Sequence, residues 1–263
     1  MATLATPAAA PVSRPSRLLA LSEGQRALFE LATLPLASPL LLSAPRGDGH
    51  PVMVIPGFMA SDRSTGVLRR YLKALGYDAH CWDLGRNLGH RSIGNNGEHL
   101  VEKLAAIHEK TGKKVSLVGW SLGGAIARQL GQRMPGVVRQ VVTLGSPLRG
   151  DPRSTSVWRL YEMATGEKVT GSRVRDHMEE IAQPPPVPVS AVYSKADGVV
   201  PWRNCMVDET ERSENIEVYG SHVGLGVNGT VLYAVADRLA QPEGAWTRFD
   251  PAGLRGALYP SRK

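Results

Sequence analysis

The sequence has few cysteines and no long uninterrupted apolar run. Its only two cysteines, Cys81 and Cys205, exclude a disulfide-rich fold, and their spacing matches no metal site. A disulfide between them is the less favoured alternative. The longest apolar stretch, residues 31–45, is interrupted by Pro35 and Pro39 and falls short of the roughly 20 residues that a membrane-spanning helix needs. We therefore expect no transmembrane helix and a reducing, cytoplasmic location.

The first residues lack the features of a secretory signal. Residues 1–16 are rich in Ala, Pro and Ser, and prolines at positions 7, 11 and 15 interrupt their apolar character. We expect a disordered tail there and one domain over residues 17–263, because 42% hydrophobic and 21% charged residues are ordinary for a globular protein. The net charge of +7 comes from scattered residues without a nucleic-acid motif, so no nucleic-acid partner is predicted.

The rest of the chain alternates strand-like and helix-like runs, which predicts an α/β fold with a mostly parallel sheet of about seven strands and helices on both faces. The expected strands are residues 39–44, 51–55, 77–82, 113–118, 140–144, 188–193 and 215–219, and the main helices are residues 65–75, 97–110, 125–134 and 228–239. Residues 148–186 break this alternation and predict a short helical cap.

An earlier helix is predicted where Ser22 and Gln25 form a capping-box pattern before Pro35. Its apolar side chains either pack on the domain or make a peripheral membrane contact.

One short motif lies between an expected strand and an expected helix. Residues 119–124 read Gly-Trp-Ser-Leu-Gly-Gly. A Gly-x-Ser-x-Gly turn in this context holds its serine in a strained conformation above the sheet, with glycines where a Cβ would clash. Ser121 is therefore the predicted nucleophile.

A serine nucleophile needs a base and a group that orients the base. Among seven histidines, His222 alone directly follows an expected strand, at the edge where Ser121 emerges. Asp197 follows the strand before it and is the predicted acid, with Asp208 as a rival in an acidic segment. The order serine, aspartate, histidine matches α/β-hydrolase triads.

The remaining predicted site residues stabilise or hold the substrate. The backbone N–H groups of Phe58 and Leu122 are candidate oxyanion donors, because they follow a strand end and the nucleophile. Trp120, Trp158 and Tyr161 are candidate substrate contacts. On a helix, Val157, Leu160 and Tyr161 would form one apolar stripe, and Trp158 would broaden it. This stripe would rest either over the acyl-binding side of the site or against the sheet domain.

These motifs resemble the α/β-hydrolase fold family, specifically bacterial lipases and carboxylesterases. The resemblance runs from about Pro51 to Leu239 and includes Val-Ile-Pro-Gly-Phe at 54–58, the segment 111–124 and Val-Thr-Leu-Gly-Ser-Pro at 142–147. This sequence departs from the family pattern at Pro56, Trp120 and Leu148, where such lipases often carry histidine. These departures argue against true lipase activity and calcium binding.

The resemblance implies hydrolysis of a small-molecule or lipid ester, without a cofactor or metal. An acyltransferase or a thioesterase would use the same triad, and a catalytically silent binding module would keep the same fold. The sequence does not specify the oligomeric state.

Overall fold

The centre of the fold is a parallel sheet of six strands in the order β2-β1-β3-β4-β5-β6. The computed structural model describes residues 13–251 and 253–260, so residues 1–12 of the expected tail lie outside the described residues. Every strand pair is parallel. The expected α/β class is confirmed. The strands are β1 (Pro51–Ile55), β2 (Asp78–His80), β3 (Val115–Trp120), β4 (Val138–Leu144), β5 (Val189–Tyr193) and β6 (Ser213–Glu217).

Of the seven expected strands, the one at residues 39–44 is wrong. Residues 39–42 instead belong to the short helix α2 (Ser38–Leu42), which directly follows the 3-10 helix η1 (Leu34–Ala37). A proline lies at the start of each helix, where its missing N–H costs no hydrogen bond. Leu40 and Leu41 pack against a buried apolar cluster of the main domain. A short apolar run alone cannot distinguish a strand from such a helix.

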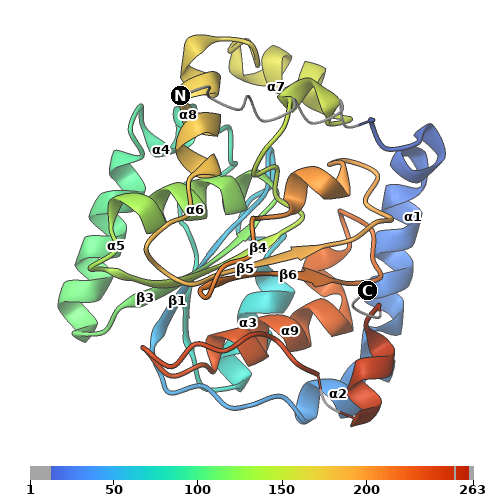
Figure 1. Ribbon diagram of the computed structural model, residues 1–263, viewed down its shortest axis with the longest axis vertical. Coiled ribbons are helices and arrows are strands. Elements are labelled where there is room, and N and C mark those ends of the chain that lie inside the picture. Colours follow the sequence, from blue (N-terminus) through green and yellow to red (C-terminus); the bar gives the residue numbers. More distant parts are fainter. Residues whose placement is uncertain (1–12, 252, 261–263) are drawn as a thin grey trace, which may run out of the picture.

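Helices cover both faces of the sheet (Figure 1). Alternate residues of β1 show the division: Val52 and Val54 join one buried apolar cluster, whereas Met53 and Ile55 join the other. Helices α3 (Gly66–Ala74) and α9 (Gly229–Leu239) contribute to the first cluster, and α5 (Glu98–Thr111) and α6 (Leu122–Arg133) to the second. Burial of both faces explains the continuous apolar strands.

The first described helix, α1 (Arg17–Thr33), begins five residues before Ser22, the first residue of the predicted capping box. Its N-cap is Ser16, whose side chain accepts a hydrogen bond from the Leu19 amide at 3.3 Å, so the prediction from Ser22 was wrong. None of the described helices is long and apolar enough to cross a membrane.

Residues 148–186 contain η2 (Pro152–Ser154), α7 (Trp158–Thr165) and α8 (Ser172–Ala182), and no strand is described within them. They lie on the α6 side of the sheet, near the short helix α4 (His90–Ile93) (Figure 1). The remaining 3-10 helices are η3 (Trp202–Cys205), η4 (Leu225–Val227) and η5 (Gly253–Leu258). The described Cys81 and Cys205 are both free thiols.

Candidate active site

Ser121 occupies the sharp turn between β3 and α6. Its backbone has φ 53° and ψ −122°, a conformation that is uncommon outside glycine. A Cβ on Gly119 would lie 2.3 Å from the Gly123 carbonyl oxygen, and one on Gly123 would lie 2.3 Å from the Ile55 carbonyl oxygen. The turn therefore requires both glycines, because strand and helix backbones meet there.

The structure brings His222 and Asp197 together. The imidazole Nδ1 lies 2.6 Å from Asp197 Oδ2, and both side chains are buried. The other oxygen, Oδ1, accepts hydrogen bonds from the amides of Val199 at 2.8 Å and Val200 at 2.7 Å. The carboxylate is thereby held with one oxygen directed at the imidazole.

Four influences compete at the imidazole of His222. Burial, the largest of them, lowers the pKa of His222 because it disfavours the charged form. The charge of Asp197, its hydrogen bond to the ring and the charge of Glu23 raise it, and the net effect is a pKa above the usual value. The site therefore stabilises the charged imidazolium form more than water does for a free histidine side chain.

The rival acid, Asp208, lies elsewhere. Its side chain is 92% exposed and pairs with Arg149 at 3.0 Å. An exposed ion pair of this kind is screened by solvent. Of the two candidate acids, only Asp197 is a partner of His222.

Two contacts connect the Ser121 turn to its surroundings, one to the loop of His222 and one to the end of β4. The indole N–H of Trp120 donates to the His222 carbonyl oxygen at 3.0 Å, and the Ser121 amide donates to the Leu144 carbonyl oxygen at 2.8 Å. Gly145 follows Leu144 with φ +56°, and a Cβ there would lie 3.1 Å from both His222 Nδ1 and Asp197 Oδ2. Ser121, Asp197 and His222 therefore each lie near the end of β4.

The turn after β1 lies directly against Ser121. A Cβ on Gly57 would be 3.2 Å from Ser121 Cβ. The backbone N–H groups of Phe58 and Leu122 donate to no other atom among the described residues. Buried Asn87, which sequence reasoning missed, stabilises this turn. Its side-chain NH₂ group donates to the Pro56 carbonyl oxygen at 2.7 Å, and its backbone carbonyl oxygen accepts a hydrogen bond from the Met59 amide at 2.8 Å.

Ser121 opens onto a cavity of about 550 Å³, a volume suited to a small ligand. Phe58, Leu122, Trp158 and Tyr161 also line it, whereas Trp120 is not among its described lining residues. Several apolar lining residues come from the segment 148–186. They are Val157, Val169, Val174 and Met178. On α7, Val157, Trp158 and Tyr161 face the cavity, but the expected stripe member Leu160 is 39% exposed.

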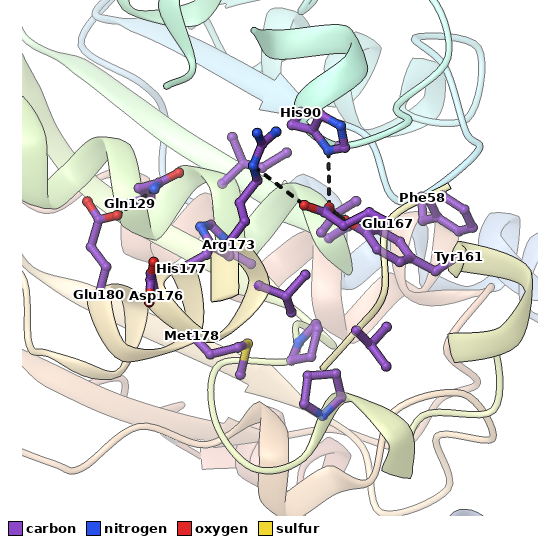
Figure 2. Close-up of a pocket in the computed structure, with 18 of the residues that line it drawn as sticks. Phe58, His90, Gln129, Tyr161, Glu167, Arg173, Asp176, His177, Met178 and Glu180 are labelled. Atoms are coloured by element: carbon purple, nitrogen blue, oxygen red, sulfur yellow. Dashed lines mark hydrogen bonds and ion pairs between the residues drawn. The ribbon is translucent and has the colours of Figure 1, made fainter. Parts of the chain in front are cut away.

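One wall of the cavity carries a polar cluster centred on Glu167 (Figure 2). The Tyr161 hydroxyl donates a hydrogen bond to Glu167 Oε2 at 2.7 Å. His90 Nδ1 lies 3.1 Å from the same oxygen, and Arg173 Nε lies 3.7 Å from Glu167 Oε1. Burial, with help from Glu167, raises the pKa of Tyr161. These residues form no sequence motif, because His90, Tyr161 and Arg173 come from three separate helices and Glu167 comes from a loop.

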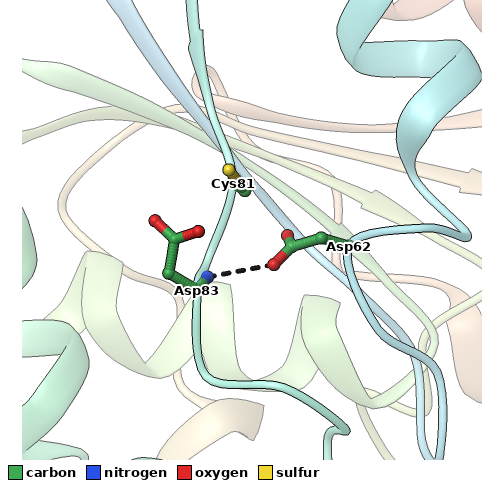
Figure 3. Close-up of side chains that lie close together, drawn as sticks. All are labelled: Asp62, Cys81 and Asp83. Carbon is green, nitrogen blue, oxygen red and sulfur yellow. Dashed lines mark hydrogen bonds between the residues drawn. The ribbon is translucent and has the colours of Figure 1, made fainter.

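A second cluster, Asp62, Cys81 and Asp83, lies outside this cavity's described lining (Figure 3). Asp62 accepts hydrogen bonds from the amides of Trp82 at 3.0 Å and Asp83 at 3.1 Å. Asp83 also pairs with Lys103. Because hydrogen bonds and an ion pair already use these carboxylates, the cluster is explained without a metal.

Comparison with known proteins agrees with this architecture. The family model described as palmitoyl protein thioesterase matches residues 51–186. Two solved lipases are similar: a Paleococcus ferrophilus monoacylglycerol lipase (17% identity, TM-score 0.53, covering 75% of this chain and 96% of that one) and the mature Bacillus licheniformis lipase BlEst2 (19%, 0.53, 73% and 92%). The metagenomic α/β hydrolase MGS-MChE2 is also similar (20%, 0.51, 70% and 87%). The TM-scores show that these proteins share the fold of this chain, as expected from the sequence, and at such low identities the likeness shows the fold alone.

Proposed function

The chain belongs to the palmitoyl protein thioesterase family, and on this premise we propose that it is a serine hydrolase of carboxylic acyl esters. The observation that carries the proposal is the strained Ser121 turn, which opens onto the cavity beside the buried Asp197–His222 pair.

In the proposed reaction, His222 takes the proton of the Ser121 hydroxyl as the oxygen attacks the acyl carbonyl carbon. Asp197 holds the imidazole in the required tautomer. The N–H groups of Phe58 and Leu122 stabilise the negative charge on the carbonyl oxygen. The protonated His222 then gives its proton to the leaving alcohol, and water releases the acid from the acyl-enzyme by the reverse sequence.

Fluorophosphonate labelling combined with ester turnover tests this proposal. We expect one covalent adduct on Ser121, found by mass spectrometry of peptides, and hydrolysis of nitrophenyl acyl esters. Absence of both in the folded protein would instead favour a binding module.

Thioester hydrolysis is a second candidate, and the family match supports it. The same acyl-enzyme would form, with a thiol as the leaving group. Turnover of octanoyl-coenzyme A and of nitrophenyl octanoate separates the two substrates, and an added alcohol that accepts the acyl group would reveal an acyltransferase.

We further propose that residues 148–186 act as a cap over the acyl-binding part of the cavity. Trp158→Ala should then lower turnover of octanoyl esters severalfold while acetyl esters change little, because each buried methylene is worth up to about 0.8 kcal/mol. The measurement is kcat/KM across nitrophenyl esters of increasing chain length.

A matched control for this prediction lies on the same helix. Met163 is 77% exposed and is not among the described residues lining the cavity, so Met163→Ala should leave the chain-length profile unchanged. Equal losses on both substrates in Trp158→Ala, with a lower melting temperature, would mean that Trp158 only stabilises the fold.

The outer face of α1 is proposed to rest on an anionic lipid surface. Leu18, Leu21, Leu28 and Phe29 on this helix are each at least 68% exposed. The two acidic residues of α1 bond inward, and exposed Arg14 and Arg17 lie at its start. Apolar side chains flanked by basic ones suit an interface with anionic headgroups. Such contact is compatible with the proposed cytoplasmic location.

We expect the protein to cosediment with phosphatidylglycerol vesicles, and Leu21→Ser with Leu28→Ser to reduce the bound fraction severalfold. Leu160→Ser, an exposed leucine outside α1, is the control. If the double variant instead abolishes a dimer seen by light scattering and vesicles bind neither form, the face contacts a second copy of the chain.

A further inference from the structure

Helix α1 presents three charged side chains to the loops that carry the predicted acid and base. Glu23, Arg26 and Glu30 lie on one face, because residues three, four and seven apart align along a helix. Glu23 is only 5% exposed, which is rare for a carboxylate unless its oxygens are hydrogen-bonded. The sequence offered no sign of this role.

The carboxylate of Glu23 joins the two loops. Its Oε1 accepts a hydrogen bond from the Gly198 amide at 2.7 Å, and its Oε2 accepts one from the Val223 amide at 2.8 Å. Gly198 directly follows Asp197, and Val223 directly follows His222. One planar group thereby fixes the separation of the two loops.

The packing leaves little room for another arrangement. A Cβ on Gly198 would lie 2.5 Å from the backbone of Leu19, and one on Gly224 would lie 2.4 Å from Glu30 Oε2. Arg26 donates to the Ala196 carbonyl at 2.7 Å and to Glu23 at 2.7 Å. The helix and the two loops therefore form one close-fitting unit.

We propose that Glu23 is a positioning residue of the active site, which aligns Asp197 with His222 and supplies a second negative charge that stabilises the imidazolium. Its effect on turnover rests on the proposed function. Its effect on His222 does not, because the imidazole can be titrated in a protein of any activity.

The charges around His222 set the sign of the expected effect. The charged side chains around it are Asp197, which follows β5, and Glu23, Arg26 and Glu30 on α1. The Cys205 thiol of η3 lies near Asp197, and burial raises its pKa so that it stays neutral. Trp120 and Gly145, from the ends of β3 and β4, are uncharged. Glu23 raises the pKa of His222, and Arg26 partly neutralises Glu23.

Glu23→Gln keeps the size of the side chain and removes its charge. We expect this variant to lower the pKa of His222 by about half a unit or more, since removing a nearby negative charge disfavours the imidazolium. The measurement is an NMR titration of the imidazole nitrogens in the full chain. In activity, the acid limb of kcat/KM should move to lower pH, and kcat should fall severalfold with little change in KM.

Glu30→Gln is the matched control. Glu30 accepts a hydrogen bond from the Ser221 amide at 2.7 Å, so it holds the same loop, but it bonds to neither Gly198 nor Val223, the residues that follow Asp197 and His222. This variant should lower the melting temperature without moving the titration of His222. If both variants lower the melting temperature and neither moves that titration, Glu23 is structural and the proposal is wrong.

Arg26→Met keeps the proposal testable if Glu23→Gln does not fold. It leaves both bonds from Glu23 to the loops and removes the neutralising cation, so the pKa of His222 should rise. An unchanged or lower value would overturn the proposal. Absence of fluorophosphonate labelling with these shifts intact would instead overturn the proposed hydrolase activity and leave the electrostatic role in place.

Discussion

Replacing Ser121 with alanine is expected to lower ester turnover by about a thousandfold or more, and His222→Ala should do the same, because the members of a triad act as a unit. Ser121→Ala removes the oxygen that forms the acyl bond. His222→Ala removes the imidazole that lies 2.6 Å from Asp197 and serves as the proposed base. The measurement is kcat/KM on a nitrophenyl ester with protein purified free of contaminating esterases.

Folding and labelling decide what such losses mean. Both variants should keep the circular dichroism spectrum and a cooperative thermal transition. Ser172 also lines the cavity, so Ser172→Ala is the matched control and should retain the fluorophosphonate adduct. If folded Ser121→Ala kept near-normal turnover and still reacted covalently with the probe, the nucleophile would be another residue.

The features that the sequence predicted well are those with a local signature. The β3 strand has continuous apolar residues because both faces of the sheet are covered, and the glycines of the Ser121 turn mark backbone contacts that no side chain would fit. The proximity of Asp197 and His222 could be predicted because parallel strands bring their carboxyl ends to one edge of the sheet.

The errors and omissions involve contacts that have no local signature. Residues 39–42 are helical because Leu40 and Leu41 pack against the main domain, a contact that a six-residue window does not contain. Glu23 and Gly198 are 175 positions apart, and a glutamate on a helix ordinarily indicates a solvated face. Trp120 was expected at the substrate, but its indole binds the His222 carbonyl.

Asp197→Asn is expected to have an effect far larger than its change in size suggests. Oδ1 already accepts two amide hydrogen bonds, so the new amide would keep its oxygen there and direct its NH₂ group at His222 Nδ1. Nδ1 would then have to accept a hydrogen bond, which places the ring proton on Nε2. That tautomer cannot take the proton of Ser121, and the corresponding change in a well-studied triad lowers kcat by about 10⁴.

Asp208→Asn is the matched comparison, since it makes the same chemical change at the rival acid. It removes an exposed pairing with Arg149 and should alter kcat by less than about twofold. Measuring kcat for both variants at the pH optimum, with melting temperatures alongside, compares the two acids directly. A large loss in Asp208→Asn and near-normal turnover in Asp197→Asn would reverse the assignment, and it would mean that the buried 2.6 Å contact to His222 contributes to the fold but not to proton transfer.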